Sequence, residues 1–464
     1  EAKHFVAVIG GAVSGSVAAE ILADQGIEVV VIEQNERPYG KIEDGLPRWH
    51  HHQRKQEYGR IDARLTKPGV HYLPCTKLGK DIDFTDLTEK WGLSAVLLAN
   101  GAWRDRPLPV DGGDEFIGNG IENQNPFIYW FNHKEEASFD GRHIHIPDEP
   151  IVFGGGLASI DVLKICQIEL YQRALKERGI EVDMLELEKK GIPATCEKHG
   201  IADPEELGIK GALMLYRRRA VDMPLAQPPE NATPEQMEKT IAARQKLLTR
   251  AQERYLFRVQ DKTLPLELVI EDGKIKGVKV VRTEVDGRKA TPIPGTEHTI
   301  ESELLISSIG SLPEKLPGIE TKGEYYTFKD WDLGIYGGCE GVFGVGNVVT
   351  GQGNIRLSLM HSKKVAGYLM ENYFDGSAVS EHLKKREPLS PEKVNELRER
   401  VKMLQSKVGY DGDYMAWMKK VTSTRKCRSG HSPASPALAR GCAAYHRITC
   451  APSEPRHCAV CRTP

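Results

Sequence analysis

The sequence has no long apolar run and no excess of charge of either sign. No stretch approaches 18 consecutive apolar residues, so no segment has the pattern of a membrane-spanning helix. The net charge is only -2 over 464 residues, which argues against a nucleic-acid-binding protein, because phosphate contacts need a basic excess. Hydrophobic residues make up 40% and charged residues 28% of the chain. These values are typical of a globular protein, and the length predicts two or more domains.

Cysteine is scarce in most of the chain. Cys75, Cys166, Cys196 and Cys339 are scattered without paired spacing, which predicts a reduced, cytoplasmic protein. No CxxC dithiol occurs in this part of the sequence. The chain starts almost directly with an apolar strand, so we expect neither a signal peptide nor an additional N-terminal module.

The last segment, 423–464, differs sharply in composition. It contains five cysteines, several histidines and hardly any acidic residues. These could suggest a zinc or iron–sulfur site, but only Cys458 and Cys461 form a CxxC pair, whereas strong metal motifs have two such pairs. The three adjacent histidines of "WHHHQRK" (49–55) would point around a helix rather than at one ion. We therefore predict no metal site and a disordered tail.

A first glycine-rich turn lies near the N-terminus. The sequence "FVAVIGGAVSGSVAAEILADQGIEVVVIE" (5–33) predicts a strand, a turn, a helix over 16–25 and a second strand that ends in Glu33. This βαβ unit has the length of a dinucleotide-binding fold. Gly10 would make the tight turn, Gly15 would allow helix and strand to pack closely, and Ala12 stands where a glycine is usual. The helix N-terminus can bind a pyrophosphate, and Glu33 can accept hydrogen bonds from a ribose diol.

A second glycine-rich turn lies in "PIVFGGGLASIDVLK" (150–164), again between a short apolar strand and a helix. Gly154 and Gly156 occupy the first two fingerprint positions and Ser159 the third. The next strand of this unit is predicted in "GALMLYRRR" (211–219), after a largely helical insertion over about 165–210.

Three consecutive arginines follow that strand. The end of the second strand is where the adenosine ribose lies in such folds, and arginine there accommodates a 2′-phosphate, because its planar fork can bind phosphate oxygens in pairs. Glu33 and the pair Arg217 and Arg218 therefore predict two different ligands, FAD and NADPH. Arg219 either shares the phosphate contact or faces solvent.

With these residues the sequence resembles the two-dinucleotide-binding-domain flavoproteins. The resemblance is to the branch that contains the glutamate synthase small subunit and the adrenodoxin (ferredoxin)–NADP reductases. It covers roughly residues 4–375 and rests on "GGGLASIDV" (154–162), "YRRRAVDMP" (216–224), "AVLLANGAWRDRPLPVDG" (95–112), "LLISSIGSLP" (304–313) and "GVFGVGNVVTGQGNI" (341–355).

The resemblance implies a set of cofactor-binding residues. Those expected to contact FAD are Gly10, Ala12, Gly15, Glu33, Gly40, Leu46, Gly346, Asn347, Gly353, Asn354 and Ile355. Those expected to contact NADPH are Gly154, Gly156, Leu157, Ala158, Ser159, Arg217 and Arg218. Asn347 stands where this motif usually has Asp. A helix that begins after "TGQGNI" would direct its N-terminal dipole toward the flavin.

The resemblance also implies an α/β fold of two Rossmann-like domains. We expect a discontinuous FAD-binding domain over 1–112 and 306–375, an inserted NADPH-binding domain over 113–305, and a C-terminal arm over 376–422. The segment 228–255 is predicted to contain a charged, solvent-facing helix. The arm, which contains a predicted helix over part of 390–420, would pack on the body or on a second copy in a homodimer.

The implied activity is that of an FAD-dependent NADPH oxidoreductase. Hydride would pass from NADPH to FAD, and electrons would then leave to an iron–sulfur protein such as ferredoxin. No residue is predicted to act as acid, base or nucleophile, because the flavin supplies the chemistry. Two alternatives stay open. In the first, the chain is an electron-transfer subunit of a glutamate synthase-like complex, although no iron–sulfur cluster domain is visible in the sequence. In the second, it is a catalytically silent FAD/NADP-binding protein.

Overall fold

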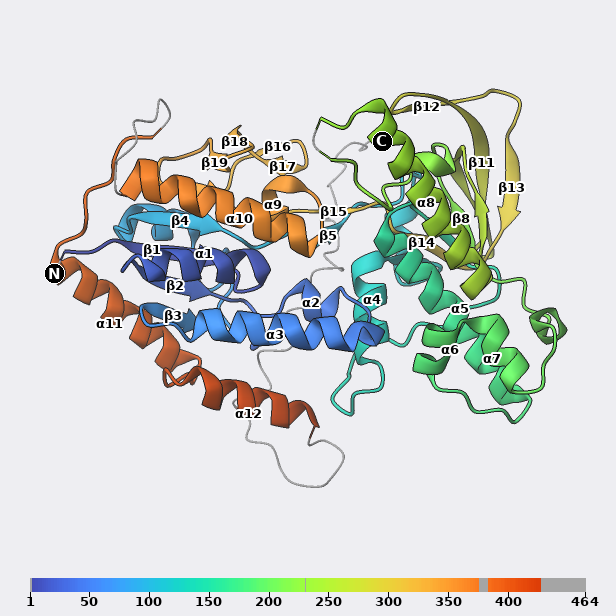
Figure 1. The fold of residues 1–464 in the computed structure, drawn as a ribbon, viewed down its shortest axis with the longest axis horizontal. Coiled ribbons are helices and arrows are strands. Elements are labelled where there is room, and N and C mark those ends of the chain that lie inside the picture. Colours follow the sequence, from blue (N-terminus) through green and yellow to red (C-terminus); the bar gives the residue numbers. More distant parts are fainter. Residues whose placement is uncertain (1, 230, 375–382, 427–464) are drawn as a thin grey trace, which may run out of the picture.

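The computed structural model describes residues 2–229, 231–374 and 383–426. Two α/β lobes lie side by side in Figure 1, and the chain crosses between them near β5 and β15. The cysteine-rich part of the tail, 427–464, falls outside the described residues, so its predicted disorder and the metal site weighed against it stay untested. Among the described residues, the four cysteines form no disulfide.

The first lobe is built on a seven-stranded sheet. Its order is β18 (Phe328–Asp330), β19 (Ile335–Tyr336), β20 (Val342–Gly344), β4 (Ala95–Leu98), β1 (Phe5–Ile9), β2 (Glu28–Ile32) and β3 (Val70–Leu73). The strands from β20 to β3 are parallel, and β18 and β19 add an antiparallel edge. Strands β1, β2 and β4 are buried over their whole length, which explains their unbroken apolar runs.

Alternate residues of β1 face two different cores. Val6 and Val8 pack with helices α1 (Val13–Asp24), α3 (His51–Leu65) and α10 (Ile355–Leu369). Phe5, Ala7 and Ile9 face the opposite core, which includes side chains of α11 (Pro391–Lys407). This period of two is what a strand covered on both faces requires. The predicted strand 5–9 is confirmed, and the helix begins three residues earlier than predicted.

The second lobe is built on a five-stranded parallel sheet. Its order is β6 (Ile121–Asn123), β14 (Leu305–Ser307), β7 (Ile151–Phe153), β8 (Leu213–Leu215) and β9 (Arg258–Gln260). Strand β8 pairs directly with β7, as predicted for "GALMLYRRR". Helices α4 (Gln124–His133), α5 (Leu157–Glu177) and α8 (Pro234–Tyr255) pack on one face of this sheet. The predicted insertion is helical and contains α6 (Met184–Lys190) and α7 (Ile192–Lys198).

The other face of the second sheet is covered by an antiparallel sheet that the sequence analysis did not anticipate. It contains β10 (Thr263–Glu271), β11 (Lys274–Asp286), β12 (Lys289–Pro292) and β13 (His298–Glu301). Its apolar side chains share a core with β7, β8 and β14. Strand β14 pairs with strands of the second lobe. The second lobe therefore extends to Ser307, whereas the predicted FAD-binding domain resumed at residue 306.

Two short strands connect the lobes. β5 (Arg104–Asp105) and β15 (Ser311–Leu312) form an antiparallel pair in which Asp105 lies opposite Ser311. The chain leaves the first lobe through β5 and returns through β15. Each of these strands follows a strand of one of the two sheets, β5 after β4 and β15 after β14.

The C-terminal arm packs on the first lobe, which is one of the two predicted arrangements. It consists of α11 (Pro391–Lys407) and α12 (Tyr414–Lys426) and runs along the first lobe in Figure 1. Trp417 and Tyr414 are buried in the core under α1 and α3, and the Trp417 indole donates to the Glu36 carbonyl at 2.8 Å. The ordered arm extends past the predicted boundary at 422, since α12 continues to Lys426.

Candidate functional site: a dinucleotide cavity and a second nucleotide-binding turn

A deep cavity lies at the carboxyl ends of the first-lobe strands. It encloses about 1030 Å³, including the solvent at its mouth. The ends of β1, β2 and β4 meet here, which is where ligands bind in open α/β sheets. The lining residues come from six segments, namely 9–14, 32–35, 40–42, 76–78, 99–103 and 347–358, joined by Glu314 and Leu316 from the returning chain.

The first glycine-rich turn forms the floor of this cavity. Gly10 has a φ of +98°, and a Cβ there would lie 2.7 Å from the Ala99 carbonyl oxygen. A Cβ on Gly15 would lie 1.8 Å from the Gly10 carbonyl oxygen, so helix and strand are packed as closely as the backbone allows. Ala12 is the N-cap of α1 and supplies no side-chain hydrogen bond. The free N–H groups of this helix end can therefore bind an anionic phosphate.

Glu33 follows directly after β2 and lines the cavity. It is 4% exposed. Its Oε2 accepts from the Gly11 N–H at 2.9 Å and its Oε1 from the Asn35 N–H at 2.9 Å. Burial raises the pKa of Glu33 to about 7, against the opposing effect of these two N–H groups. Each oxygen keeps a lone pair, so the carboxylate can also accept from a ribose hydroxyl.

Gly40 begins a second stretch of wall. It has a φ of +50° and is the N-cap of α2 (Lys41–Asp44), and a Cβ there would lie 3.0 Å from the Ala12 Cβ. Residues 40–42 line the cavity, but Leu46 is not among the lining residues. The Leu46 carbonyl instead accepts from Asn132 Nδ2 at 3.0 Å, so this residue contacts α4.

Two buried side-chain oxygens in the wall have no hydrogen-bond partner in the described structure. They are Asn347 Oδ1, at the start of α9 (Asn347–Thr350), and Asn100 Oδ1, and both residues line the cavity. A buried acceptor without a donor is costly, so a ligand with hydroxyl or N–H donors fits here. Gly346, next to Asn347, has a φ of +74° and supports this turn.

The third wall is the start of α10. Gly353, Asn354 and Ile355 all line the cavity, as the resemblance implied. Asn354 is the N-cap, and its side chain accepts from the Arg356 and Leu357 N–H groups. The helix dipole is therefore directed at the cavity as predicted, although two of the free N–H groups already have a partner.

Taken together, the cavity fits a flavin dinucleotide. The helix end at Ala12 suits a pyrophosphate and Glu33 suits a ribose. Asn100 and Asn347 offer acceptors to the hydroxyl and ring N–H donors of the remaining part. Apolar side chains such as Ile42 and Leu316 complete the lining, as is usual for cofactor sites.

The second glycine-rich turn lies at the carboxyl end of β7. A Cβ on Gly154 would lie 2.1 Å from the Ser308 carbonyl oxygen, whereas the space around the Gly156 Cβ position is open. Ser159 is fully buried, and its hydroxyl donates to the same Ser308 carbonyl at 3.0 Å. Ser159 therefore packs helix α5 on the sheet. Leu157 is exposed and Ala158 partly exposed at the helix N-terminus.

The arginines lie beside this turn. The Gly154 N–H donates to the Leu215 carbonyl at 3.1 Å, so the end of β8 and the turn share one edge. Arg218 is partly buried, and its guanidinium donates to the Tyr216 hydroxyl at 2.9 Å and the Asp222 carbonyl at 3.2 Å. Arg219 instead pairs with the Asp222 carboxylate at 2.8 Å. Arg217 is exposed, and within the described residues no side-chain partner is recorded for it.

Sequence reasoning missed several cavity residues. Lys41, Asn100 and Trp103 line the first cavity, and Asp105 lies close behind them on β5. For Asn100 and Trp103 the available signal was the end of the strand "AVLL", because residues that follow a parallel strand lie at its carboxyl edge.

Comparison with known proteins identifies the fold of the chain. Residues 8–58 match the NAD(P)-binding Rossmann-like domain family. FprA from Mycobacterium tuberculosis, solved in complex with NADPH, superposes with a TM-score of 0.63 at 18% identity, over 87% of this chain and 91% of that one. The chain has the FprA fold. The predicted fold class, two Rossmann-like lobes, is confirmed.

Sequence relatives agree with the resemblance. The NADPH-Fe(3+) oxidoreductase subunit beta of Geobacter sulfurreducens is 25% identical over 67% of this chain and 37% of its own length. The glutamate synthase [NADPH] small chain of Escherichia coli is 20% identical over 79% of this chain and 68% of its own length. The chain thus spans little more than a third of the first of these relatives. No described helix is long and apolar enough to cross a membrane.

Proposed function

We propose that the chain is an FAD-dependent NADPH oxidoreductase. The observation that carries the proposal is the pairing of two unlike nucleotide sites on one chain. The first cavity presents a buried acid, Glu33, where a ribose diol would lie. The second turn presents Arg217 and Arg218 where a ribose phosphate would lie. A flavin would supply the acceptance of hydride from NADPH and the release of electrons to a second acceptor.

The residues of the chain would bind and orient both cofactors. The N-terminus of α1 would hold the pyrophosphate through Gly10, Ala12 and the close packing at Gly15. Gly40, Gly346, Asn347 and the 353–355 segment would surround the rest of FAD. On the second lobe, Gly156, Leu157 and Ala158 at the start of α5 would contact the NADPH pyrophosphate, with Gly154 and Ser159 shaping the turn from behind.

The proposed acceptor is an iron–sulfur protein, either free or as a partner subunit. A second candidate function is an electron-transfer subunit, which is favoured by relatives named as subunit beta and small chain. We also propose a cytoplasmic location, because the four cysteines of the described residues are scattered and form no disulfide. We also propose that the chain forms a homodimer. The arm packs on its own lobe, so its packing gives no support for this dimer.

Two measurements test this proposal. Acid denaturation of the purified protein followed by chromatography should release one FAD per chain, and NADPH should then support reduction of an added ferredoxin. FAD release with NADPH oxidation but no ferredoxin reduction would favour the subunit alternative. Absence of bound flavin, together with failure to bind added FAD, would refute the proposal.

A further inference from the structure

A polar cluster lies where the flavin cavity meets the strands that connect the lobes. Lys41 lines the cavity, and its Nζ lies 3.1 Å from Ser311 Oγ and 5.5 Å from the centre of the Trp103 ring. Asn125 donates through Nδ2 to the same Ser311 oxygen at 3.1 Å and through its backbone N–H to Asp105 Oδ1 at 3.1 Å. The cluster therefore contains residues from both crossover strands and from α4.

Lys41 and Asp105 influence each other electrostatically in this cluster. Burial lowers the pKa of Lys41 to about 8, and Asp105 opposes this shift. Burial also raises the pKa of Asp105 to about 6, and Lys41 opposes that shift. Each group therefore favours the charged form of the other, and the cavity wall presents a lysine with an acid close to it.

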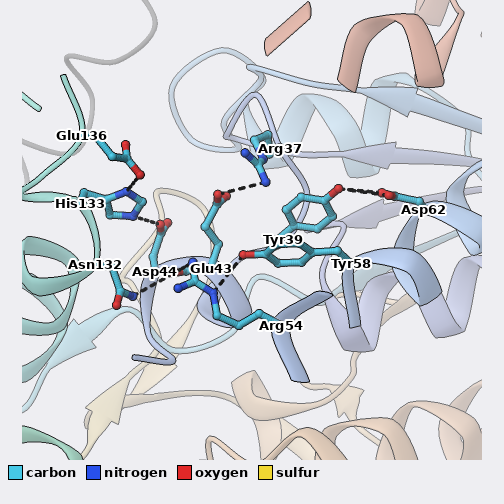
Figure 2. A network of polar contacts seen from close by, with 10 residues as sticks. All are labelled: Arg37, Tyr39, Glu43, Asp44, Arg54, Tyr58, Asp62, Asn132, His133 and Glu136. Carbon is cyan, nitrogen blue, oxygen red and sulfur yellow. Dashed lines mark hydrogen bonds and ion pairs between the residues drawn. The ribbon is translucent and has the colours of Figure 1, made fainter. Parts of the chain in front are cut away.

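The short helix that carries Lys41 is fixed from two sides. Figure 2 shows the polar network around its last two residues, Glu43 and Asp44. The Glu43 carbonyl accepts from Asn132 Nδ2 at 3.0 Å and from Arg54 at 2.9 Å. Asp44 accepts from His133 Nε2 at 3.0 Å. Because α3 and α4 both hold α2, the Lys41 backbone is fixed relative to both lobes, and the ammonium is preorganised.

We propose that Lys41 is a cofactor-contacting residue whose ammonium stabilises the negative charge gained by a bound flavin on reduction, with Ser311 and Asp105 as its positioning residues. The inference rests on the proposed function. A fixed charge in a cavity that excludes water acts much more strongly than one in solvent. The Nζ is directed to Ser311 and Trp103 at the connecting strands, whereas the phosphate-binding turn belongs to α1. The ammonium therefore lies on the side of the cavity where the chain crosses between the two lobes.

The experiment measures the midpoint potential of the FAD-loaded protein by dye equilibration and absorbance. Lys41→Met should favour the oxidised form at least tenfold, which corresponds to a potential about 30 mV more negative for two electrons. Lys41→Arg keeps the charge and should restore most of the shift. Lys164→Met is the matched control, because Lys164 also lies over a tryptophan ring, at 4.6 Å from Trp49, and pairs with an acid, Glu188, at 2.9 Å. It belongs to α5 and should leave the potential unchanged.

The outcomes separate the inference from the proposed function. A Lys41→Met protein that binds FAD, is reduced by NADPH and keeps the wild-type potential would overturn the inference alone. Weaker FAD retention with an unchanged potential would also overturn it, because it would place Lys41 on a phosphate. If Lys41→Met does not fold, Lys41→Gln provides the same test with a polar side chain. A wild-type protein that binds no FAD would refute the proposed function itself.

Discussion

The three arginines after β8 give the sharpest prediction, because their side chains have different surroundings. Arg218 is held by the Tyr216 hydroxyl and the Asp222 carbonyl, so little side-chain entropy is lost when it binds a phosphate. A charge-assisted hydrogen bond contributes roughly 1.5–3 kcal/mol, and each 1.4 kcal/mol is about tenfold in affinity. Arg218→Ala should therefore weaken NADPH binding by about 10- to 100-fold. NADH binding should change little, since NADH lacks the 2′-phosphate.

The neighbouring arginines provide the internal controls. Arg217→Ala should have a smaller effect on NADPH, because that side chain is exposed and must be ordered on binding. Arg219→Ala should have the smallest effect, because Arg219 already pairs with Asp222. The assay is anaerobic titration of each variant with NADPH and with NADH, followed by isothermal calorimetry. Equal losses for both nucleotides, or an Arg219 variant as weak as the Arg218 variant, would refute this assignment.

Three further predictions follow from the first lobe. Gly15→Val should yield protein without FAD, because a Cβ at this position would lie 1.8 Å from the Gly10 carbonyl oxygen. The ratio of absorbance at about 450 and 280 nm measures the flavin content. A variant that contains a full complement of flavin would contradict the packing argument. Trp417→Ala should lower the free energy of unfolding by about 3–5 kcal/mol in urea titrations, as for other buried aromatic residues, and a loss below about 1 kcal/mol would contradict the docking of the arm. The hydrogen bond from His71, with help from the arm residue Arg398, lowers the pKa of Glu28 to about 2. A depressed carboxyl pKa stabilises the folded state above the unfolded-state pKa, and this stabilisation is lost as the pH falls toward about 2. Glu28→Gln should therefore flatten the decline of the urea midpoint between about pH 4.5 and 2. Parallel curves of urea midpoint against pH for the variant and the wild type would contradict the assignment.

The sequence predicted those parts of the site that depend on local motifs. Gly10, Gly15 and Glu33 belong to one βαβ unit whose turn, helix and strand end are contiguous in the chain. The start of α10 at Ile355 was likewise predictable from its own segment. In each case the backbone of a short segment determines which groups face the ligand.

Residues brought together by the crossover could not be predicted in this way. Lys41, Asp105, Asn125 and Ser311 come from four segments, and they meet only because β5 pairs with β15 and α4 packs beside α2. Leu46 was expected near the flavin, but its carbonyl contacts Asn132. The pairing that determines these contacts is long-range and leaves no periodic signal.

The antiparallel sheet of the second lobe is a different case, because its signals were present. Asp272-Gly273 and Asp286-Gly287 lie between segments of β-rich sequence, and Asp-Gly pairs are typical of tight hairpin turns. Both pairs do connect consecutive strands, β10 to β11 and β11 to β12. This sheet was predictable from local turn chemistry.

The most direct test of the account is anaerobic stopped-flow absorbance of the purified protein, mixed separately with NADPH and with NADH. If FAD occupies the first cavity and NADPH the second turn, the flavin band should bleach rapidly with NADPH and much more slowly with NADH. A protein that contains FAD but is bleached by neither nucleotide would contradict the claim that these two sites work together in hydride transfer.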